Sequence, residues 1–347
     1  MREGKLSFSV SETVVFYPLL RYDKRDELGL FEIEIDLQRR NRMLDICLLG
    51  TGGMMPMPSR FLTSMLARLN GRLMLIDCGE GTQVTMKMLG WGFKAIDVIC
   101  ITHFHADHIS GLPGLLLTIG NAGRTEPVTM IGPVGLRKVV EGLTIIASEL
   151  PFEIEYIELE KDTPNPIQIG EFEIHYCLAD HMVRCYAYRI DLNRRGKFDV
   201  KKAEALHLPK PLWGRVQKEG RVEHEGKVYT ADMVLGESRK GISVAYCTDS
   251  RPVDRVMQFV KGVQLFICEG MYGEEEKKQK ARENKHMLFS EAARMAKNAN
   301  VEKLWLTHFS PSLHEPEEYL PMAQAIFPET ELGEERKCIT IEFPKEA

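Results

Sequence analysis

His103-Phe104-His105-Ala106-Asp107-His108 sets four strong metal ligands within six residues of sequence. An apolar run at 98–102 precedes this stretch and predicts a buried strand, and an apolar run at 109–117 follows it and predicts a helix. The end of a strand can aim the two alternating histidines at one point, while Asp107 and His108 turn toward a second point beside it. Packing alone rarely requires three histidines and an aspartate at this spacing, so the stretch predicts a loop that serves two metal ions.

The composition is that of a globular protein, with 44% hydrophobic and 27% charged residues in a chain of 347. This length suffices for one large domain or two ordinary ones. No apolar run approaches the about 20 residues needed to cross a bilayer, and the first residues lack the apolar core of a signal peptide. The eight cysteines stand singly, without a C-x-x-C pair, and are expected as free thiols. We therefore expect a cytoplasmic protein with no membrane segment.

Charge is distributed unevenly along the chain. The formal net charge of the whole chain is −5, whereas residues 189–240 hold thirteen Lys and Arg against eight Asp and Glu, a local net charge of +5. A basic segment on an acidic body favours binding of a polyanion such as a nucleic acid. The alternative interpretation is an irregular surface loop whose charges are simply solvated.

The pattern of apolar runs divides the chain into an extension, a large folded region and an insertion within it. Residues 1–43 form the predicted N-terminal extension, in which 31–37 alternates polar and apolar residues as a half-exposed strand does. Strand-like runs, among them 172–178 and 184–190, and helix-like runs near 110–121 and 133–148 mix throughout 44–347. The charge run at 274–285 is expected to be a solvated helix or loop, and a segment rich in Lys, Arg, Gly and Pro at about 193–240 interrupts the pattern. The sequence contains no internal repeat and no G-x-G-x-x-G motif. This mixture predicts two mixed sheets covered by helices.

Three more candidate ligands follow strand-like runs elsewhere in the chain, as the first four do: His181, Asp249 and His308. Taken singly, each histidine has an ordinary alternative as a strand-end residue, and Asp249 has one as the cap of a following helix. The ligand loop needs partners, however, and this need favours all three as ligands. Histidine together with carboxylate suits zinc, manganese or iron. Two such ions bridged by an aspartate lower the pKa of a shared water and clamp an in-line phosphoryl displacement.

The H-x-H-x-D-H signature at 103–108, with the three later ligands, resembles the metallo-β-lactamase superfamily. Within that superfamily the chain resembles the ribonuclease Z family, the tRNA 3′-processing endonucleases. L-L-G-T-G-G at 48–53 and I-D-C-G-E-G-T-Q at 76–83 look like the first two sequence blocks of that family. Further matching blocks lie at 186–190, 208–214 and 249–252. The resemblance covers residues 44–343 and implies a fold of class α/β (α+β), a four-layer αββα metallo-β-lactamase sandwich of two mixed sheets flanked by helices.

The same resemblance implies two zinc ions, with Mn2+ or Fe2+ as alternatives to Zn2+, held by two groups of ligands. One group is His103, His105 and His181, the other is Asp107, His108 and His308, and Asp249 bridges them. It also implies that Asp107 acts as the general base, that His286 faces the scissile phosphate and assists the leaving group, and that Asp77 orients the histidine loop. In the family the insertion is a protruding arm that grips tRNA, and a homodimer lets each arm serve the site of the other subunit.

Four blocks depart from the family pattern, at 248–250, 268–271, 286–288 and 310–313. They leave every expected ligand in place but change residues near the scissile phosphate, so three hypotheses stay open. The first is a zinc-dependent endoribonuclease that removes 3′ trailers from precursor tRNA, which the ligand set and the basic insertion favour. The second is a metal-dependent phosphodiesterase of the same fold that acts on a small molecule or a non-tRNA nucleic acid. The third is a non-catalytic nucleic-acid-binding protein on the same fold.

Overall fold

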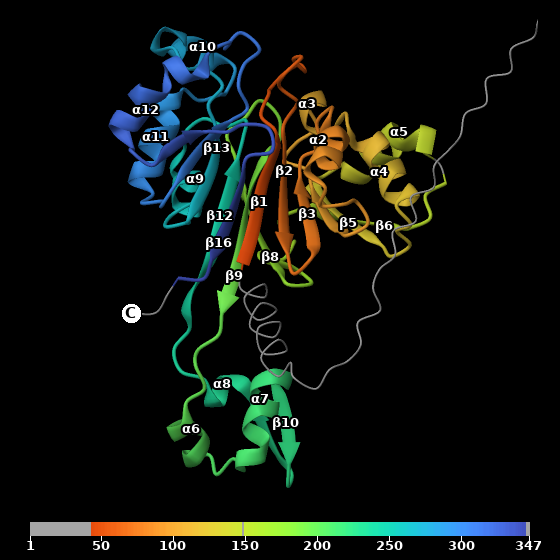
Figure 1. Cartoon of the computed structure of the whole chain (residues 1–347), viewed down its shortest axis with the longest axis vertical. Helices are drawn as coiled ribbons and strands as arrows, with labels where there is room; N and C mark the ends of the chain where they lie inside the picture. The colour runs from red at the N-terminus through yellow and green to blue at the C-terminus, as the bar shows by residue number, and fades with distance from the viewer. Residues whose placement is uncertain (1–42, 148, 345–347) are drawn as a thin grey trace, which may run out of the picture. The chain divides into compact units, whose positions relative to one another are not determined.

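A computed structural model describes residues 43–147 and 149–344. The predicted extension up to residue 42, with its strand at 31–37, lies outside the described residues. Two seven-stranded sheets and a separate two-stranded sheet hold the described strands (Figure 1).

The first sheet is assembled from the N-terminal half of the described chain and its last strand. Its strand order is β16-β1-β2-β3-β4-β5-β6. In chain order the strands are β1 (Met43–Gly50), β2 (Ser64–Leu69), β3 (Arg72–Ile76), β4 (Ile96–Cys100), β5 (Val128–Pro133), β6 (Ile154–Leu159) and β16 (Cys338–Glu342). Strands β3 to β6 run parallel, whereas β16, β1, β2 and β3 pair antiparallel. The predicted mixed character of this sheet is confirmed.

The second sheet takes its strands from the C-terminal half, in the order β15-β14-β13-β12-β9-β8-β7. In chain order they are β7 (Ile167–Ile169), β8 (Phe172–Leu178), β9 (Tyr186–Arg194), β12 (Arg239–Cys247), β13 (Leu265–Glu269), β14 (Leu304–Thr307) and β15 (Thr330–Leu332). Strands β12 to β15 run parallel, and β9 pairs antiparallel with both β12 and β8. The predicted strand at 184–190 continues further than expected, because the pairing of β9 with β12 extends to Arg194 opposite Arg239.

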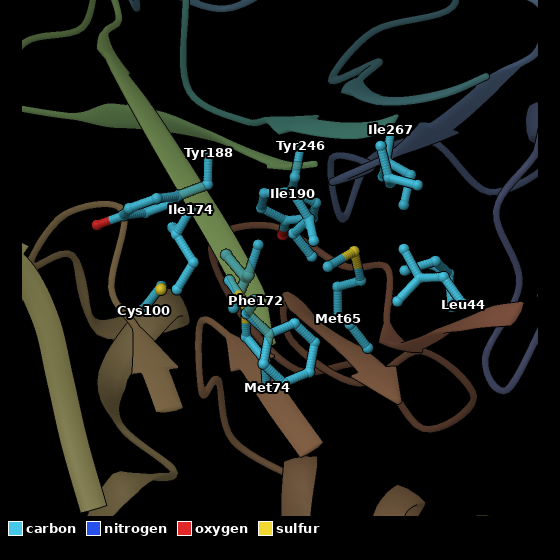
Figure 2. Packing of buried hydrophobic residues seen from close by; sticks show 14 of the residues in the cluster. Leu44, Met65, Met74, Cys100, Phe172, Ile174, Tyr188, Ile190, Tyr246 and Ile267 are labelled. Atoms are coloured by element: carbon cyan, nitrogen blue, oxygen red, sulfur yellow. The ribbon is translucent and has the colours of Figure 1, made fainter. Parts of the chain in front are cut away.

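Apolar side chains of the two sheets meet in a buried layer between them. Leu44 and Met65 of the first sheet lie in this layer with Tyr246 and Ile267 of the second (Figure 2). Neighbouring positions of a strand point to opposite faces, so Ala245 is buried instead among the helices on the outer face of the second sheet. Strands buried on both faces read as nearly continuous apolar runs, which explains why they were recognisable in the sequence.

Helices cover the outer face of each sheet. On the first sheet pack α2 (Thr82–Leu89), α4 (Leu112–Asn121) and α5 (Leu136–Leu143), and on the second pack α9 (Asp254–Phe259), α11 (Phe289–Asn298) and α12 (Leu320–Ile326). Helix α4 buries Leu112, Leu115, Leu116 and Ile119, a spacing that places one apolar stripe against the sheet. The predicted four-layer αββα sandwich is therefore confirmed.

One predicted helix is shorter than expected. The sequence predicts a helix near 133–148, but α5 ends at Leu143 and continues as the 3-10 turn η1 (Thr144–Ala147). Gly142 and the β-branched run Thr144-Ile145-Ile146 have low helix propensity, which accounts for the tighter last turn.

The segment between β9 and β12 folds as a small unit with its own core. It contains α6 (Val200–Ala205), η2 (Lys210–Leu212), α7 (Trp213–Glu219), β10 (Arg221–His224), β11 (Lys227–Thr230) and α8 (Ala231–Val234). Its buried residues are Ala203, Leu208, Val216, Val222, Tyr229 and Val234. The Asp199 side chain accepts hydrogen bonds from the Lys201 and Lys202 N–H groups and so caps α6. The segment thus has regular structure, and the alternative of an irregular solvated loop does not describe it.

The described part of the chain offers no helix with both the length and the apolar character that crossing a bilayer requires.

Candidate metal centre

The candidate ligands lie close together because the carboxyl ends of strands from both sheets meet at one edge of the fold. Parallel strands bring their carboxyl ends to one edge of a sheet, where side chains of the following loops converge. His103 follows β4 in the first sheet, while Asp249 follows β12 and His308 follows β14 in the second. Strand β8 also runs parallel to β12, since both are antiparallel to β9, and His181 follows it. Four loops from two sheets therefore supply the site.

The first group of donor atoms comprises three imidazole nitrogens and one carboxylate oxygen. His103 Nε2 lies 2.9 Å from His105 Nδ1, and His181 Nε2 lies 3.3 Å from the same nitrogen. Asp249 Oδ1 lies 3.8 Å from His103 Nε2 and 3.6 Å from His181 Nε2. These four atoms surround one point.

The second group lies beside the first and shares Asp249 with it. His108 Nε2 and His308 Nε2 are 3.2 Å apart. Asp107 Oδ2 lies 3.6 Å from His108 Nε2 and 3.3 Å from His308 Nε2. Asp249 Oδ2 lies 3.1 Å from His108 Nε2 and 3.2 Å from His308 Nε2. Asp249 therefore offers one oxygen to each group, as a bridging carboxylate does.

These separations fit divalent cations. Ligands held about 2.0–2.1 Å from a tetrahedral ion lie roughly 3.3–3.4 Å from one another. Asp249 Oδ2 is also buried without a hydrogen bond of suitable geometry to any described residue. A buried carboxylate oxygen left unpaired is costly, and a bound cation would satisfy it. The donor set thus matches the divalent metals that use histidine and carboxylate.

The far sides of the His108 and His181 rings are hydrogen-bonded, which fixes the orientation of these two rings. His108 Nδ1 lies 2.7 Å from Asp77 Oδ2, and Asp77 Oδ1 accepts a hydrogen bond of 2.8 Å from the Thr102 N–H. His181 Nδ1 donates to the Lys285 carbonyl oxygen at 3.3 Å. Each contact places the proton on Nδ1 and leaves Nε2 free to bind a cation. Asp77 was expected behind the histidine loop, and the structure places it there.

Backbone strain is concentrated at this edge. Asp77, Asp249 and His308 adopt left-handed conformations, with φ of 59°, 54° and 58°. Such a conformation costs a non-glycine residue about 1–2 kcal/mol, so it persists only where surrounding contacts require it. Gly53 allows the close approach of the next loop, because a Cβ there would lie 2.6 Å from the His308 ring. The strained backbone at Asp249 and His308 directs these two candidate ligands toward the other donor atoms.

The pKa shifts of two carboxylates and one histidine of the site suit metal binding. Burial acts to raise the pKa of Asp107, but His308 and His108 outweigh it and hold that pKa well below its usual range. The pKa of Asp249 is also lowered, because His308, His108 and His103 outweigh its burial. Burial lowers the pKa of His103. The carboxylates are therefore ionised and His103 is neutral near pH 7, the forms in which both bind metals.

His286 lies at the same cavity, held by a carboxylate of its own. His286 Nδ1 is 3.0 Å from Glu269 Oε2 and 3.9 Å from Asp249 Oδ1. Burial acts to lower the pKa of His286, but Glu269 raises it to about 9. Glu269 is fully buried and also accepts hydrogen bonds from the Met287 N–H at 3.0 Å and the Ser250 N–H at 2.5 Å. The carboxylate thus fixes both the ring and the loop that carries it.

A cavity of about 340 Å³ opens over the two donor groups. Its lining comes from both sheets and from the loop around α10 (Lys278–Glu283): Met54, His105, Asp107, His181, Met182, Asp249, Tyr272, Glu283, Asn284, His286 and His308. The structure therefore brings together at one place all seven predicted ligands and His286. Their roles as ligands and catalysts stay predictions.

Sequence reasoning missed three contacts that shape the site. Glu269 had no assigned role, although it lies in the block at 268–271 that departs from the family pattern. The Met54 N–H donates to Asp107 Oδ2 at 2.6 Å, and the Lys285 carbonyl accepts from His181. The last two contacts use the backbone, so residue type gives no signal for them.

Solved structures show the fold. The metallo-β-lactamase fold protein YhfI of Bacillus subtilis superposes with a TM-score of 0.62 at 19% identity, covering 86% of this chain and 100% of that one. The short form of human tRNase Z gives a TM-score of 0.61 at 23% identity, covering 87% of this chain and 100% of that one. Residues 44–141 also match a family described as "Anti-Pycsar protein Apyc1", which covers the region of the first four ligands.

Curated relatives match much more closely in sequence. The ribonuclease Z of Clostridium acetobutylicum is 56% identical over 306 residues, covering 87% of this chain and 99% of the relative. The ribonuclease Z of Lachnoclostridium phytofermentans is 54% identical over 303 residues, with the same coverage. The resemblance indicated by the sequence motifs is confirmed, and the chain belongs to the ribonuclease Z family.

Proposed function

We propose that this chain is a metal-dependent endoribonuclease that removes 3′ trailers from precursor tRNA. Its family membership supports hydrolysis of RNA phosphodiesters. The observation that carries the proposal is the geometry of Asp249, which presents one carboxylate oxygen to each of two groups of metal-binding atoms. Two adjacent cations are the arrangement that phosphodiester hydrolases use to hold both the attacking and the leaving oxygen.

The ions we propose are two Zn²⁺. His103, His105 and His181 would hold one, Asp107, His108 and His308 the other, and Asp249 both. When bound, the pair would activate water and neutralise charge on the phosphate. Mn²⁺ and Fe²⁺ accept the same ligand types, so the metal content of protein purified without added metal decides among the three.

Two side chains are placed to move protons. Asp107 lines the shared cavity and its Oδ2 accepts a hydrogen bond from the Met54 N–H, so we assign the Asp107 carboxylate to accept a proton from the attacking water. The His286 Nδ1–H donates a hydrogen bond to Glu269 Oε2. This leaves Nε2 free to donate a proton to the departing 3′ oxygen. The bond from phosphorus to that oxygen breaks, leaving a 3′-hydroxyl on the tRNA and a 5′-phosphate on the trailer.

The folded insertion at 195–238 is the proposed tRNA-binding arm, with its excess of Lys and Arg meeting phosphates. It leaves from the end of β12 opposite to Asp249 (Figure 1). Strand β12 has nine residues, so the insertion and Asp249 lie at opposite ends of a strand about 30 Å long. We propose a homodimer in which the arm of one chain serves the site of the other. A cytoplasmic location stays a prediction.

The direct test is cleavage of a 3′-extended precursor tRNA by zinc-loaded protein, beside Asp107→Ala and EDTA-treated controls. A single cut after the discriminator nucleotide, absent from both controls, supports the proposal. If no cut appears while a simple phosphodiester is hydrolysed in a metal-dependent way, the substrate belongs to the second hypothesis, a small molecule or another nucleic acid. Unchanged function of the Asp107→Ala protein would support the non-catalytic alternative.

A further inference from the structure

Exposed methionines stand at the entrance of the catalytic cavity. Met54 from the loop after β1 has 65% of its surface exposed, and Met182 from the loop after β8 has 67%. Both line the cavity together with Asp107 and His286. The two side chains therefore come from different sheets and border the same opening. Large apolar side chains exposed at the mouth of a polar site often mark where a ligand makes apolar contact.

The Met54 backbone is hydrogen-bonded to a site residue, and Met182 is the chain neighbour of another. Met54 has a φ of 69°, a strained conformation, and its N–H donates to Asp107 Oδ2 at 2.6 Å. Met182 directly follows His181, whose Nδ1 donates to the Lys285 carbonyl oxygen. The Cα of Met54 is thus set relative to Asp107, and Met182 adjoins an oriented histidine, while both long side chains stay adaptable.

We propose that Met54 and Met182 form a platform for the unpaired nucleobase next to the scissile phosphate. This inference rests on the proposed function, since it concerns how the same cavity receives RNA. When the phosphate lies over the two donor groups, its charge faces the polar floor of the cavity. The attached base must then pass the rim, where its flat aromatic surface meets two polarizable thioethers.

Methionine suits a base of variable identity. Sulfur makes favourable contacts with aromatic rings, and an unbranched side chain adapts to purines and pyrimidines alike. Stacking on a side chain is sequence-tolerant because every base has an aromatic face. A platform of this kind would orient the trailer without reading its sequence. Such a platform would limit rotation of the adjoining nucleotide and so help to position the scissile phosphate.

The experiment compares kcat/KM on two precursor tRNAs, one intact and one with an abasic residue at the trailer nucleotide next to the cleavage site. For the wild-type protein, removal of the base should lower kcat/KM roughly tenfold. For Met54→Ser/Met182→Ser, kcat/KM on the intact precursor should already be reduced by about that factor, and removal of the base should change little more. For Met54→Leu/Met182→Leu, removal of the base should still lower kcat/KM, but by less than in the wild type, since leucine keeps an apolar surface.

Met55→Ser is the matched control, because Met55 is similarly exposed, at 55%, in the same loop but does not line the cavity. It should behave as the wild type toward both precursors. Equal sensitivity of wild type and double serine variant to loss of the base would overturn the inference. So would a double serine variant whose only defect is loss of dimers in size-exclusion chromatography, since the rim would then be a protein contact.

A second readout separates this inference from the proposed function. The probe is a short single-stranded RNA with 2-aminopurine beside a non-cleavable phosphonate linkage, mixed with metal-loaded protein. Quenching by the wild type but not by the double serine variant supports the platform, even if precursor tRNA is not cleaved. Cleavage of the tRNA with identical quenching by both proteins leaves the proposed function standing and rejects the platform.

Discussion

Asp249 directs one carboxylate oxygen toward each of the two donor groups and makes them a single centre. Its backbone is strained, its Oδ2 is buried without a hydrogen bond of suitable geometry among the described residues, and three histidines face it. A buried carboxylate in this setting is stable only with compensating positive charge. Backbone strain, burial and the geometry of a candidate bridging ligand therefore coincide at Asp249.

Replacing Asp249 by alanine should lower bound metal from about two ions per chain to one or fewer, because both groups lose an oxygen ligand. Metal content measured by inductively coupled plasma mass spectrometry after dialysis checks this. Asp254→Ala, an exposed aspartate on α9, is the control and should retain its metal. If Asp249→Ala retains two ions per chain, the two Asp249 oxygens are not needed to hold them.

A second prediction at this scale concerns Glu269. Glu269→Gln should lower kcat roughly 10- to 100-fold with little change in KM, because His286 loses the carboxylate that orients its ring. Steady-state kinetics on precursor tRNA, with circular dichroism to verify folding, measures the effect. The exposed Glu275→Gln serves as control. A rise in KM alone would assign Glu269 to substrate binding instead.

At the scale of elements, the insertion has its own small core and connects to the rest through two paired strands. Arg194 and Arg239, the last residue of β9 and the first of β12, are register partners. The strands therefore already lie side by side where the insertion begins and ends. A two-residue turn such as Asn-Gly can join antiparallel strands at that spacing.

Replacing 195–238 by Asn-Gly should abolish efficient cleavage of precursor tRNA while a small chromogenic phosphodiester is still hydrolysed. The reason is that the proposed arm would supply phosphate contacts remote from the candidate metal centre. The intact protein should also lose tRNA affinity steeply between low and moderate salt, and the deletion variant should show a shallower slope. If tRNA cleavage survives the deletion, the basic segment has another role.

For the whole molecule, the candidate metal centre draws its residues from both sheets. His103, His105, Asp107 and His108 come from the first sheet, whereas His181, Asp249 and His308 come from the second. The buried layer between the sheets holds them together (Figure 2). The candidate ligands would do so at the strand ends that carry them. Metal binding should therefore stabilise the packing of one sheet on the other.

Removing metal should lower the melting temperature by several degrees. A ligand that binds only the folded state at 100 times its Kd contributes about 2.7 kcal/mol, and each kcal/mol shifts the melting temperature by roughly 2–4 °C in a domain of this order of size. Differential scanning calorimetry with and without EDTA measures the change. In Asp249→Ala the change should be smaller, and equal melting temperatures in wild type with and without metal would contradict the prediction.

The sequence by itself determined the local features of this protein. The ligand loop at 103–108 is contiguous, and a buried strand before it is visible as an apolar run, so both were recognisable without a structure. Strand β8 was expected at 172–178 and occupies those residues. The four-layer fold followed from the family resemblance, and the small core of the insertion did not, because its apolar residues lie scattered among charged ones.

Only the tertiary structure decided which distant residues meet. The Met54 N–H reaches Asp107, Glu269 holds His286, and the Lys285 carbonyl orients His181, although 274–285 was expected only as a solvated helix or loop. Each contact depends on the order of strands in a sheet or on the packing of one sheet against the other. Local propensity carries no information about that order, because it arises when buried faces from distant parts of the chain pack together.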